Sequence, residues 1–418
     1  MAAPFHVEQV RRQFPALRQT VAGHQAVFFD GPAGTQVPQR VVDAVGGYLL
    51  DHNANRGGLF ATSRQSDRLL DAAHRAMADF VGAEDDDGVV FGPNMTSLAF
   101  QLSRSLARTW RSGDEILVSR SGHDANVTPW VLAAEDAGVA VRHIEVRPDD
   151  CTLDLDDFRS QLSSRTRLVA IACASNLSGT IQPFREITAA AHDAGALVFL
   201  DAVQWAPHRL IDVTAWKCDL LACSAYKFFG PHVGVLWGRR ELLERLPAYK
   251  VRPATEELPG RWMTGTQNHE GIAGAMAAVE YLADLGRTMM PALSDRRQAL
   301  RAALETIARH ERQLCQRLIE GLQAFDGLRV WGITDSERFD QRVPTVSFTH
   351  AAQSPERIAE FLGHHGVFVW HGNFYALPLS EALGLEPEGL IRVGLVHYNT
   401  AAEVDRLLEL LGELQAGR

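Results

Sequence analysis

One lysine of this chain has a side chain that could do covalent chemistry, and we expect the rest of the fold to position it. The chain has 418 residues, and only three of its 41 Lys and Arg residues are lysines, Lys217, Lys227 and Lys250. Lys227 stands in Ser-Ala-Tyr-Lys-Phe-Phe-Gly-Pro, residues 224–231, between apolar and aromatic neighbours. A lysine amine can form an imine with a carbonyl compound, and an arginine cannot. We interpret Lys227 as a reactive amine; a lysine that reaches from a strand end into water is the alternative.

Three other polar positions follow apolar runs. Asp201 ends the run Val-Phe-Leu and precedes Lys227 by 26 residues, a position from which a carboxylate can hold a protonated pyridine nitrogen. Asn94-Met95-Thr96-Ser97 stands at an expected strand-turn-helix junction, where backbone amides and a hydroxyl suit a phosphate. His123 follows another expected strand. Taken alone, each position could instead be a helix cap or a structural histidine.

These positions need a framework of strands and helices. Short apolar runs that predict strands alternate with helical patterns such as 95–110 and 184–194. This alternation predicts an α/β fold with a mostly parallel sheet covered on both faces. Ligands of such sheets bind at the carboxyl ends of the strands. The expected strands are 89–91, 116–118, 139–144, 168–172, 197–200, 220–223 and 233–237.

The pattern changes at about residue 285. A long helical pattern runs to about Gln323, and shorter helices and antiparallel-type strands follow it, which predicts a smaller α+β domain. We expect an N-terminal helix in residues 1–25 that packs with the small domain, a large domain at 26–284 and the small domain at 285–418. The later elements are expected at 345–348, 355–364, 367–370, 391–395 and 401–414.

Composition narrows the class of protein. The net charge is −10 and no basic block occurs, which disfavours nucleic acid as a partner. No apolar run reaches the roughly 18 residues of a membrane span, and the start lacks the apolar core of a signal peptide, so we expect a cytoplasmic protein. The five cysteines are odd in number and form no CxxC pair, so we expect free thiols and no metal site.

The polar positions, taken together, resemble a known family. The resemblance is to the fold-type I pyridoxal phosphate enzymes, and more narrowly to the class V aminotransferase family of cysteine desulfurases, selenocysteine lyases and isopenicillin N epimerase. It implies a seven-stranded type of large-domain sheet, pyridoxal 5'-phosphate as cofactor, and an enzyme of the lyase or transferase type. The residues that carry it are Thr96, His123, Asn176, Asp201, Gln204, Ser224 and Lys227, with Ser-x-aromatic-Lys-x-x-Gly-Pro.

The resemblance implies roles for the cofactor-binding residues. Lys227 binds the cofactor as an imine, Asp201 pairs with the pyridine nitrogen, and Gln204 faces the ring hydroxyl. His123 stacks on the ring and Asn176 lies near the substrate or a ring oxygen. The phosphate is bound by Thr96, the Met95 amide, Ser224 and Tyr226, which replaces the family's usual histidine.

The resemblance also implies a substrate site and a partner. Arg392 matches the anchor for the carboxylate of a small amino-acid substrate, a role that suits its planar fork. Thr266 matches a residue that reaches the phosphate of the neighbouring subunit, which implies a homodimer with shared active sites. Arg56, beside two glycines, is a candidate for a second anionic group or a solvated loop residue. Asn373, in the loop at the presumed mouth, is a further candidate for substrate binding.

One departure from the family bears on the reaction. Desulfurases carry a nucleophilic cysteine on a mobile loop, whereas Tyr375 occupies that position here and no cysteine follows Cys315. We therefore expect β-elimination of the carbon-sulfur lyase type, with Lys227 taking the α-proton and His371 or Tyr375 protonating the leaving group. Epimerisation, transamination, desulfurase-like activity and a non-catalytic cofactor-binding scaffold are the alternatives.

Overall fold

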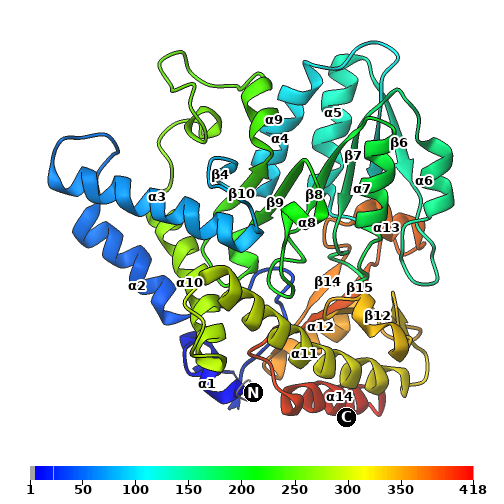
Figure 1. Ribbon diagram of the computed structural model, residues 1–418. Helices are drawn as coiled ribbons and strands as arrows, with labels where there is room; N and C mark the ends of the chain where they lie inside the picture. Colours follow the sequence, from blue (N-terminus) through cyan, green and yellow to red (C-terminus); the bar gives the residue numbers. More distant parts are fainter. Residues whose placement is uncertain (1–4, 22, 418) are drawn as a thin grey trace.

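A seven-stranded sheet forms the centre of the molecule. The computed structural model describes residues 5–21 and 23–417, and its large sheet has the strand order β4-β10-β9-β8-β7-β5-β6 (Figure 1). Strands β5 to β9 are parallel, and β10 is antiparallel to both its neighbours. The mostly parallel sheet is therefore confirmed. The strands are β4 (Val89–Gly92), β5 (Glu115–Ser119), β6 (Ala140–Ile144), β7 (Thr166–Ala172), β8 (Leu197–Asp201), β9 (Leu220–Ser224) and β10 (Gly234–Gly238).

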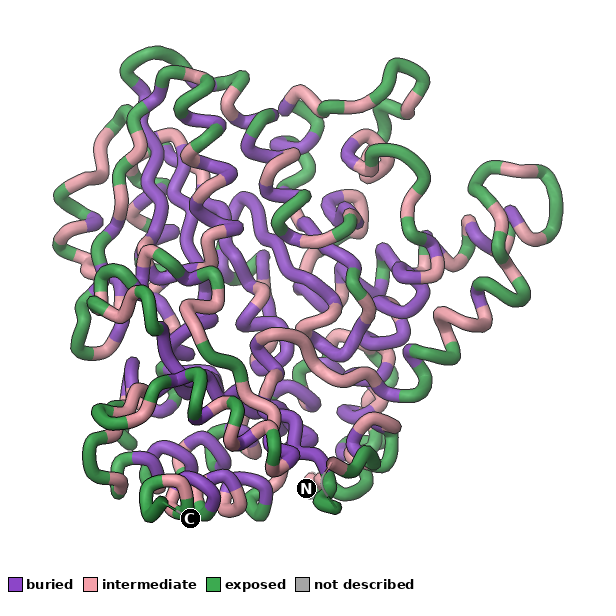
Figure 2. The backbone as a smooth tube through the Cα atoms, turned by 180° about the vertical axis from the view of Figure 1, so that it is seen from behind, coloured by how far each residue is buried: buried purple, intermediate pink, exposed green. Residues whose placement is uncertain are grey.

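Helices cover both faces of this sheet. Neighbouring strand residues point to opposite faces; Leu220 packs with α4 and α5, whereas Leu221 packs with α3, α7 and α10. Both faces are thus apolar, and most of the strands are buried (Figure 2). The edge strand β6 is the exception, since Ile144 is its one buried residue. The helices are α3 (Ala61–Val81), α4 (Met95–Ala107), α5 (Thr128–Ala137), α7 (Phe184–Asp193) and α10 (His269–Met289). Smaller helices are α2 (Gln39–Gly47), α6 (Leu155–Gln161), α8 (Val213–Trp216) and α9 (Arg240–Arg245).

A second, smaller sheet lies towards the C-terminus. Its order is β11-β12-β15-β14 and every pairing is antiparallel. Helices α11, α12 and α14 pack with it around a separate core (Figure 1). Helices beside an antiparallel sheet agree with the predicted α+β character. The elements are α11 (Arg296–Gln323), β11 (Leu328–Trp331), β12 (Thr345–His350), α12 (Pro355–His364), β14 (Trp370–Gly372), α13 (Leu377–Ala382), β15 (Leu390–Gly394) and α14 (Ala401–Gln415).

The helix predicted from about Leu285 to Gln323 is wrong as a continuous element. Helix α10 continues to Met289, and α11 begins only at Arg296. Pro291 lacks an N–H and disfavours a helical residue before it. The Asp295 side chain then caps α11 by accepting a hydrogen bond from the Gln298 amide at 2.8 Å. Residue 285 lies inside α10, and the division into 1–25, 26–284 and 285–418 stays a prediction.

The strand predicted at 367–370 is split between two sheets. β13 (Val367–Phe368) pairs in parallel with β3 (Val27–Phe28), whereas β14 starts at Trp370 and pairs with β15. The start of the chain thereby packs against its C-terminal part. A short hairpin of β1 (Thr20–Val21) and β2 (His24–Gln25) precedes β3.

The N-terminal helix is shorter than predicted. Helix α1 spans Val7–Arg11, and residues 1–4 of the expected helix lie outside the described residues. Arg11 donates from Nη1 to the Tyr398 carbonyl oxygen at 2.7 Å and forms an ion pair with Glu403 at 2.8 Å. Glu403 belongs to the capping box that starts α14.

In residues 5–21 and 23–417, no helix has both the length and the apolar character needed to cross a bilayer.

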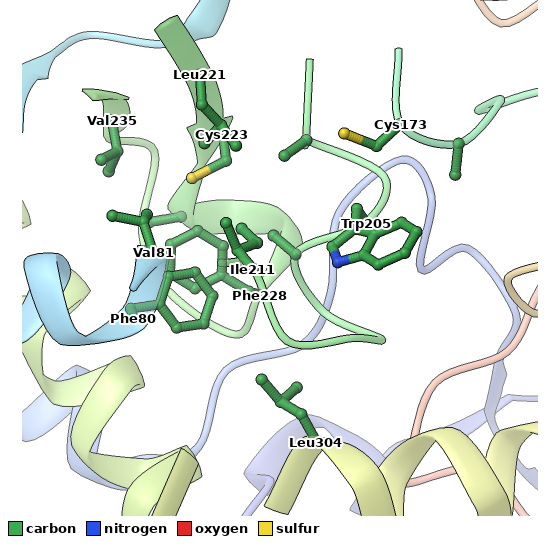
Figure 3. Packing of buried hydrophobic residues seen from close by; sticks show 14 of the residues in the cluster. Phe80, Val81, Cys173, Trp205, Ile211, Leu221, Cys223, Phe228, Val235 and Leu304 are labelled. Atoms are coloured by element: carbon green, nitrogen blue, oxygen red, sulfur yellow. The ribbon is translucent and has the colours of Figure 1, made fainter. Parts of the chain in front are cut away.

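A cluster of buried apolar side chains packs beside the turn that carries Lys227. Phe228 is fully buried and its ring lies 4.6 Å from that of Phe80 on α3, at an angle of 31°. Cys223 and Val81 lie in the same cluster (Figure 3). Burial of a phenylalanine side chain contributes about 1.5–3 kcal/mol, so the turn is anchored directly beside the reactive lysine.

Candidate active site

A cavity of about 560 Å³ opens at the carboxyl ends of β7, β8 and β9 and is bordered by the segment from Trp370 to Tyr375. Most of the predicted site residues line it, although they come from seven separate stretches of sequence. Those residues are Met95, Thr96, His123, Asn176, Asp201, Gln204, Ser224, Tyr226, Lys227, His371, Asn373, Tyr375 and Arg392.

Lys227 lies in a single 3-10 turn that follows β9. Its Nζ donates a hydrogen bond to the carbonyl oxygen of Pro32. Burial, helped by the Arg392 charge, lowers the pKa of Lys227 to about 7, while Asp201 and Asp30 oppose this shift. A substantial fraction of the amine is therefore neutral near pH 7, as a nucleophilic or basic amine requires.

Asp201 ends β8 and lies buried on the cavity wall. Its Oδ1 accepts a hydrogen bond from the Val203 amide at 2.8 Å. Burial raises the pKa of Asp201 to about 6, with the Val203 amide and Lys227 acting in the opposite direction. Such a carboxylate gains from a cationic N–H partner. Nearby, Gln204 donates from Nε2 to Thr345 Oγ1 at 2.8 Å, a contact that the sequence did not reveal.

The predicted phosphate site lies where α4 begins. Asn94 caps the helix by accepting from the Ser97 amide at 2.8 Å, and the Met95 amide donates to Ser224 Oγ at 3.1 Å. The Thr96 side chain is exposed at the cavity. Gly234 makes this junction possible, because a Cβ there would lie 2.4 Å from the Asn94 carbonyl carbon. Amide, hydroxyls and the helix dipole thus converge on one corner of the cavity.

His123 is a neutral ring on the cavity wall. Its Nδ1 accepts from the Ala125 amide at 3.0 Å, so the neutral ring carries its proton on Nε2. Burial, and then the Lys227 charge, lower the pKa of His123 to about 4. The ring stacks on Tyr375 with centroids 5.5 Å apart and an angle of 17°. His123 therefore offers a flat, uncharged surface at neutral pH.

Arg392 is buried in β15 and faces the cavity. Its Nη1 donates to the Asn176 carbonyl oxygen at 3.0 Å, and burial lowers its pKa to about 9. Asn176 donates from Nδ2 to the Phe374 carbonyl oxygen at 2.9 Å. Among the described residues, the buried Oδ1 of Asn176 has no hydrogen-bond partner. An unpartnered acceptor beside a buried guanidinium fits a polar ligand.

The segment Asn373-Phe374-Tyr375 is held in an unusual conformation. Phe374 and Tyr375 both have φ of 57°, the left-handed region that bulky side chains rarely adopt. The Tyr375 carbonyl oxygen accepts from the Asp124 amide at 2.7 Å, and the Tyr375 amide donates to Asn373 Oδ1 at 3.1 Å. Such conformations cluster at functional sites, where surrounding contacts stabilise them.

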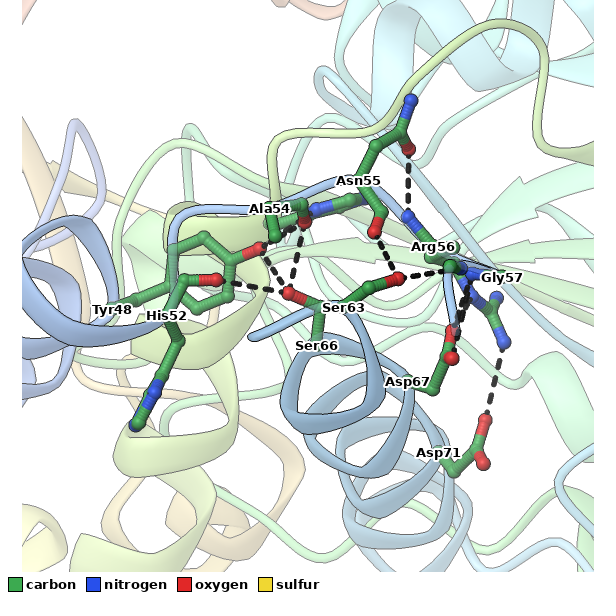
Figure 4. Close-up of polar contacts among 12 residues, drawn as sticks. Tyr48, His52, Ala54, Asn55, Arg56, Gly57, Ser63, Ser66, Asp67 and Asp71 are labelled. Carbon is green, nitrogen blue, oxygen red and sulfur yellow. Dashed lines mark hydrogen bonds and ion pairs between the residues drawn. The ribbon is translucent and has the colours of Figure 1, made fainter. Parts of the chain in front are cut away.

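Two predicted residues lie outside the cavity of this chain. Arg56 is exposed and pairs with Asp67 at 3.4 Å and Asp71 at 3.3 Å on α3 (Figure 4). Thr266 is exposed in the loop before α10. Trp262 is buried and donates from Nε1 to the Leu243 carbonyl oxygen at 3.0 Å, so it packs within the chain.

The cysteines lie away from the mouth of the cavity. All five are buried, and none belongs to the described residues that line the cavity. Burial raises the pKa of the Cys173 and Cys223 thiols well above their usual range. Cys223 lies in β9, and Cys173 directly follows β7. Buried protonated thiols are inert as nucleophiles.

The residues present fit a phosphorylated pyridine aldehyde. A lysine with a lowered pKa can bind the aldehyde carbon, and the buried Asp201 carboxylate suits a protonated ring nitrogen. The corner formed by the Met95 amide, Thr96 and Ser224 suits a phosphate, and the flat ring of His123 suits a stacked heterocycle. This α/β architecture and site define a fold-type I pyridoxal phosphate enzyme.

Comparisons with known proteins agree. Residues 27–407 match the family model described as "Aminotransferase class-V", and the chain belongs to that family. Its members are pyridoxal phosphate-dependent enzymes, so the chain is an enzyme and the non-catalytic alternative falls away.

The relatives cover the whole chain. A probable cysteine desulfurase of Vibrio cholerae is 32% identical over 96% of this chain and 97% of its own length. The aminotransferase-like protein FGM3 of Gibberella zeae is 32% identical over 98% of both chains. Among solved structures, apo cysteine desulfurase from Thermococcus onnurineus NA1 has a TM-score of 0.88 at 27% identity, with all of both chains covered. The cysteine desulfurase CsdA of Escherichia coli has a TM-score of 0.84 at 27% identity and 99% coverage of both.

Proposed function

We propose that this enzyme catalyses β-elimination from a cysteine-derived L-amino acid, in the manner of a carbon-sulfur lyase. The observation that carries the proposal is a reactive lysine in a cavity without a thiol. Lys227 has a pKa of about 7, and none of the cavity's described lining residues is a cysteine. An acid/base reaction at the substrate is supported, whereas sulfur transfer to a protein cysteine has no acceptor among these described lining residues.

We propose that pyridoxal 5'-phosphate is held by Lys227, Asp201, Gln204, His123 and Tyr226, together with the phosphate site formed by the Met95 amide, Thr96 and Ser224 at the start of α4. When bound, the cofactor supplies an electron-withdrawing ring that stabilises a carbanion at the substrate α-carbon. Asp201 keeps the ring nitrogen protonated by its negative charge, and His123 covers one ring face. The chain's own contribution is thus to hold the ring in a cavity and to keep it electron-poor.

Arg392 and Asn176 bind the substrate in this proposal. The planar guanidinium accepts a carboxylate through two parallel N–H bonds, and Asn176 Oδ1 is the free acceptor for an N–H or O–H group. Lys227 then removes the α-proton. The electron pair expels the β-substituent as a thiolate, which takes a proton from His371 or Tyr375. The remaining aminoacrylate reacts with water, so a cysteine conjugate and water give a thiol, pyruvate and ammonia.

Cysteine desulfuration is the second candidate, and it is favoured by the names of the relatives from Vibrio cholerae and Escherichia coli. Epimerisation and transamination need the same Lys227, Asp201 and Arg392. They differ in the bond that breaks and in where the proton returns. The exposed Tyr375, which stacks on His123, is our proposed acid for the lyase reaction.

A homodimer is typical of the family, and we propose that this chain forms one with shared sites. Thr266 and Arg56 are exposed within a single chain, as residues that serve a neighbouring subunit would be. Arg56 would have to leave Asp67 and Asp71 to bind a second anionic group. A cytoplasmic location, with no nucleic-acid or membrane partner, stays a prediction.

The experiment that tests the function is a product assay on the purified holoenzyme. L-cysteine, S-substituted L-cysteines and other L-amino acids are supplied, and pyruvate, thiol, sulfide, alanine and α-hydrogen exchange are measured. Pyruvate and thiol in equal amounts would support β-elimination. Alanine with sulfide would establish desulfuration instead, a keto acid without thiol would indicate transamination, and exchange without product would indicate epimerisation.

A further inference from the structure

We propose that the outer part of the active-site cavity is a subsite for an uncharged, planar aromatic group on the β-substituent of the substrate. This inference rests on the proposed amino-acid chemistry and names the substrate class for it. The subsite is formed by Trp370, Tyr375 and the edge of His123, all of which line the cavity.

The carboxylate anchor Arg392 lies beside this surface. Trp370 on β14 is the direct cross-strand partner of Arg392 on β15. Side chains of directly opposed residues in an antiparallel pair stand about 5 Å apart on the same face. A substrate whose carboxylate is bound by Arg392 therefore has the indole of Trp370 one strand away, within reach of a group carried on its β-carbon.

A second part of the cavity lining is also flat and aromatic. The rings of Tyr375 and His123 stack at 5.5 Å with an angle of 17°. The backbone holds this pair in place, since the Asp124 amide donates to the Tyr375 carbonyl oxygen at 2.7 Å. A preformed platform of this kind favours a planar guest, because few side-chain rotamers have to be frozen on binding.

Two aromatic rings of this surface are unusually exposed. Tyr375 and Trp370 have 72% and 52% of their surface exposed, which is high for large apolar rings whose backbone is well fixed. Tyr375 also occupies a left-handed backbone position at φ 57°, a conformation that costs free energy. Two exposed aromatic rings held beside a cavity are suited to contact a ligand.

The lining of the cavity carries few charges. Among the described residues that line the cavity, Asp201, Lys227 and Arg392 carry the formal charges, with histidines set aside. Each of the three already has a proposed partner in the cofactor or the substrate carboxylate. Arg56 is not among these lining residues and, within one chain, pairs with Asp67 and Asp71. A charged β-substituent would thus lose water without gaining an opposite charge from this chain's own lining residues, and a neutral one would not.

The test uses the holoenzyme and four S-substituted L-cysteines, bearing benzyl, butyl, carboxyethyl and aminoethyl groups. Dissociation constants are taken from the change in the cofactor's visible absorbance, and pyruvate release is measured separately. We expect S-benzyl-L-cysteine to bind at least about tenfold more tightly than either charged analogue, and more tightly than the butyl analogue. Equal affinities, or a preference for a charged analogue, would overturn the proposal.

Trp370→Ala provides the matched variant, because Trp370 is half-exposed on the edge strand β14 and its removal leaves the core intact. Trp370→Ala should lower the affinity for the benzyl analogue about fivefold or more and leave the affinity for S-methyl-L-cysteine within about twofold. Trp370→Phe should restore the affinity for the benzyl analogue. Tyr249→Ala, at an exposed tyrosine outside the cavity lining, is the control. An unchanged preference in Trp370→Ala would contradict the subsite.

The two proposals can fail separately. Selective binding of the benzyl analogue without pyruvate would reject β-elimination and leave the subsite standing. Pyruvate formed from all four analogues at similar affinities would support β-elimination and reject the subsite.

Discussion

The guanidinium carbon of Arg392 lies 4.0 Å from the centre of the Phe374 ring, so the guanidinium packs over the face of an aromatic ring. Its Nη1 also donates a hydrogen bond to the Asn176 carbonyl oxygen, which further restricts the orientation of the guanidinium. The contact with Phe374 and the hydrogen bond to Asn176 leave the remaining N–H groups of the guanidinium for a ligand. A carboxylate that approaches in the plane of the fork is thereby favoured over other geometries.

Arg392→Ala should weaken binding of an L-amino acid by at least about 10²-fold, because a hydrogen bond to a charged group contributes about 1.5–3 kcal/mol and two are lost. The cofactor's absorbance should stay unchanged. Spectral titration with the substrate measures both. Arg329→Ala is the matched control, since Arg329 also covers an aromatic ring, that of Trp331 at 3.7 Å, but lies outside the cavity lining. Equal binding by the Arg392→Ala and Arg329→Ala proteins would reject the carboxylate assignment.

Gly234→Ala should distort the proposed phosphate site at the start of α4. Gly234 pairs with Ser224 across β10 and β9, and a methyl group there would meet the Asn94 backbone. The Met95 amide and the Ser224 hydroxyl would then separate. We expect the affinity for pyridoxal phosphate to fall about tenfold, the equivalent of about 1.4 kcal/mol, with little change for unphosphorylated pyridoxal.

The ratio of the two affinities, measured by equilibrium dialysis of the apoprotein, separates a local effect from general destabilisation. Gly363→Ala is the control, because a methyl group at Gly363 in α12 would meet no atom within 4 Å. A Gly234→Ala protein with an unaltered affinity ratio would show that the phosphate binds elsewhere.

The uptake of pyridoxal phosphate by the apoprotein should depend on pH with a midpoint near 7. The pKa of Lys227 is lowered to about 7 by burial, and only the neutral amine attacks an aldehyde. The rate should therefore rise as pH increases through 7 and level off above about 8. Stopped-flow absorbance measures the rate. A rate that keeps rising tenfold per pH unit up to 9 would mean that Lys227 keeps an ordinary lysine pKa.

Tyr375→Phe should slow turnover by about 10²-fold if the phenol protonates the leaving group, since general acid catalysis contributes typically 10² or more. The ring and its stacking on His123 remain, so substrate affinity should change little. Comparison of kcat and KM, with Tyr249→Phe as the control, tests this. Full activity of the Tyr375→Phe enzyme would leave His371 as the proposed acid.

The centre of the site was predictable from the sequence because its residues follow strands directly. Asp201 and Lys227 come after neighbouring parallel strands, whose carboxyl ends meet at one edge of the sheet. The contact of Phe374 with Arg392, and the pairing of Trp370 with Arg392, were not predictable in this way. They depend on the register between β14 and β15 and on two left-handed residues, which no local pattern specifies.

Other misses had signals in the sequence. Leu328-Arg329-Val330 alternates apolar and charged residues, as a strand does, and with Trp331 it forms the unpredicted β11. Pro291 and Asp295 marked the end of one helix and the start of the next. The location of Arg56 had no such signal, because its ion pairs with Asp67 and Asp71 depend on how a loop folds back on α3.

The most direct test of the account is to find which lysine binds the cofactor. The holoenzyme is reduced with borohydride, digested, and its peptides are examined by mass spectrometry. Only Lys217, Lys227 and Lys250 are available as lysines. The account predicts the pyridoxyl group on the peptide that contains Lys227, and no stable label after Lys227→Ala. A label on Lys217 or Lys250, or none on any lysine, would contradict it.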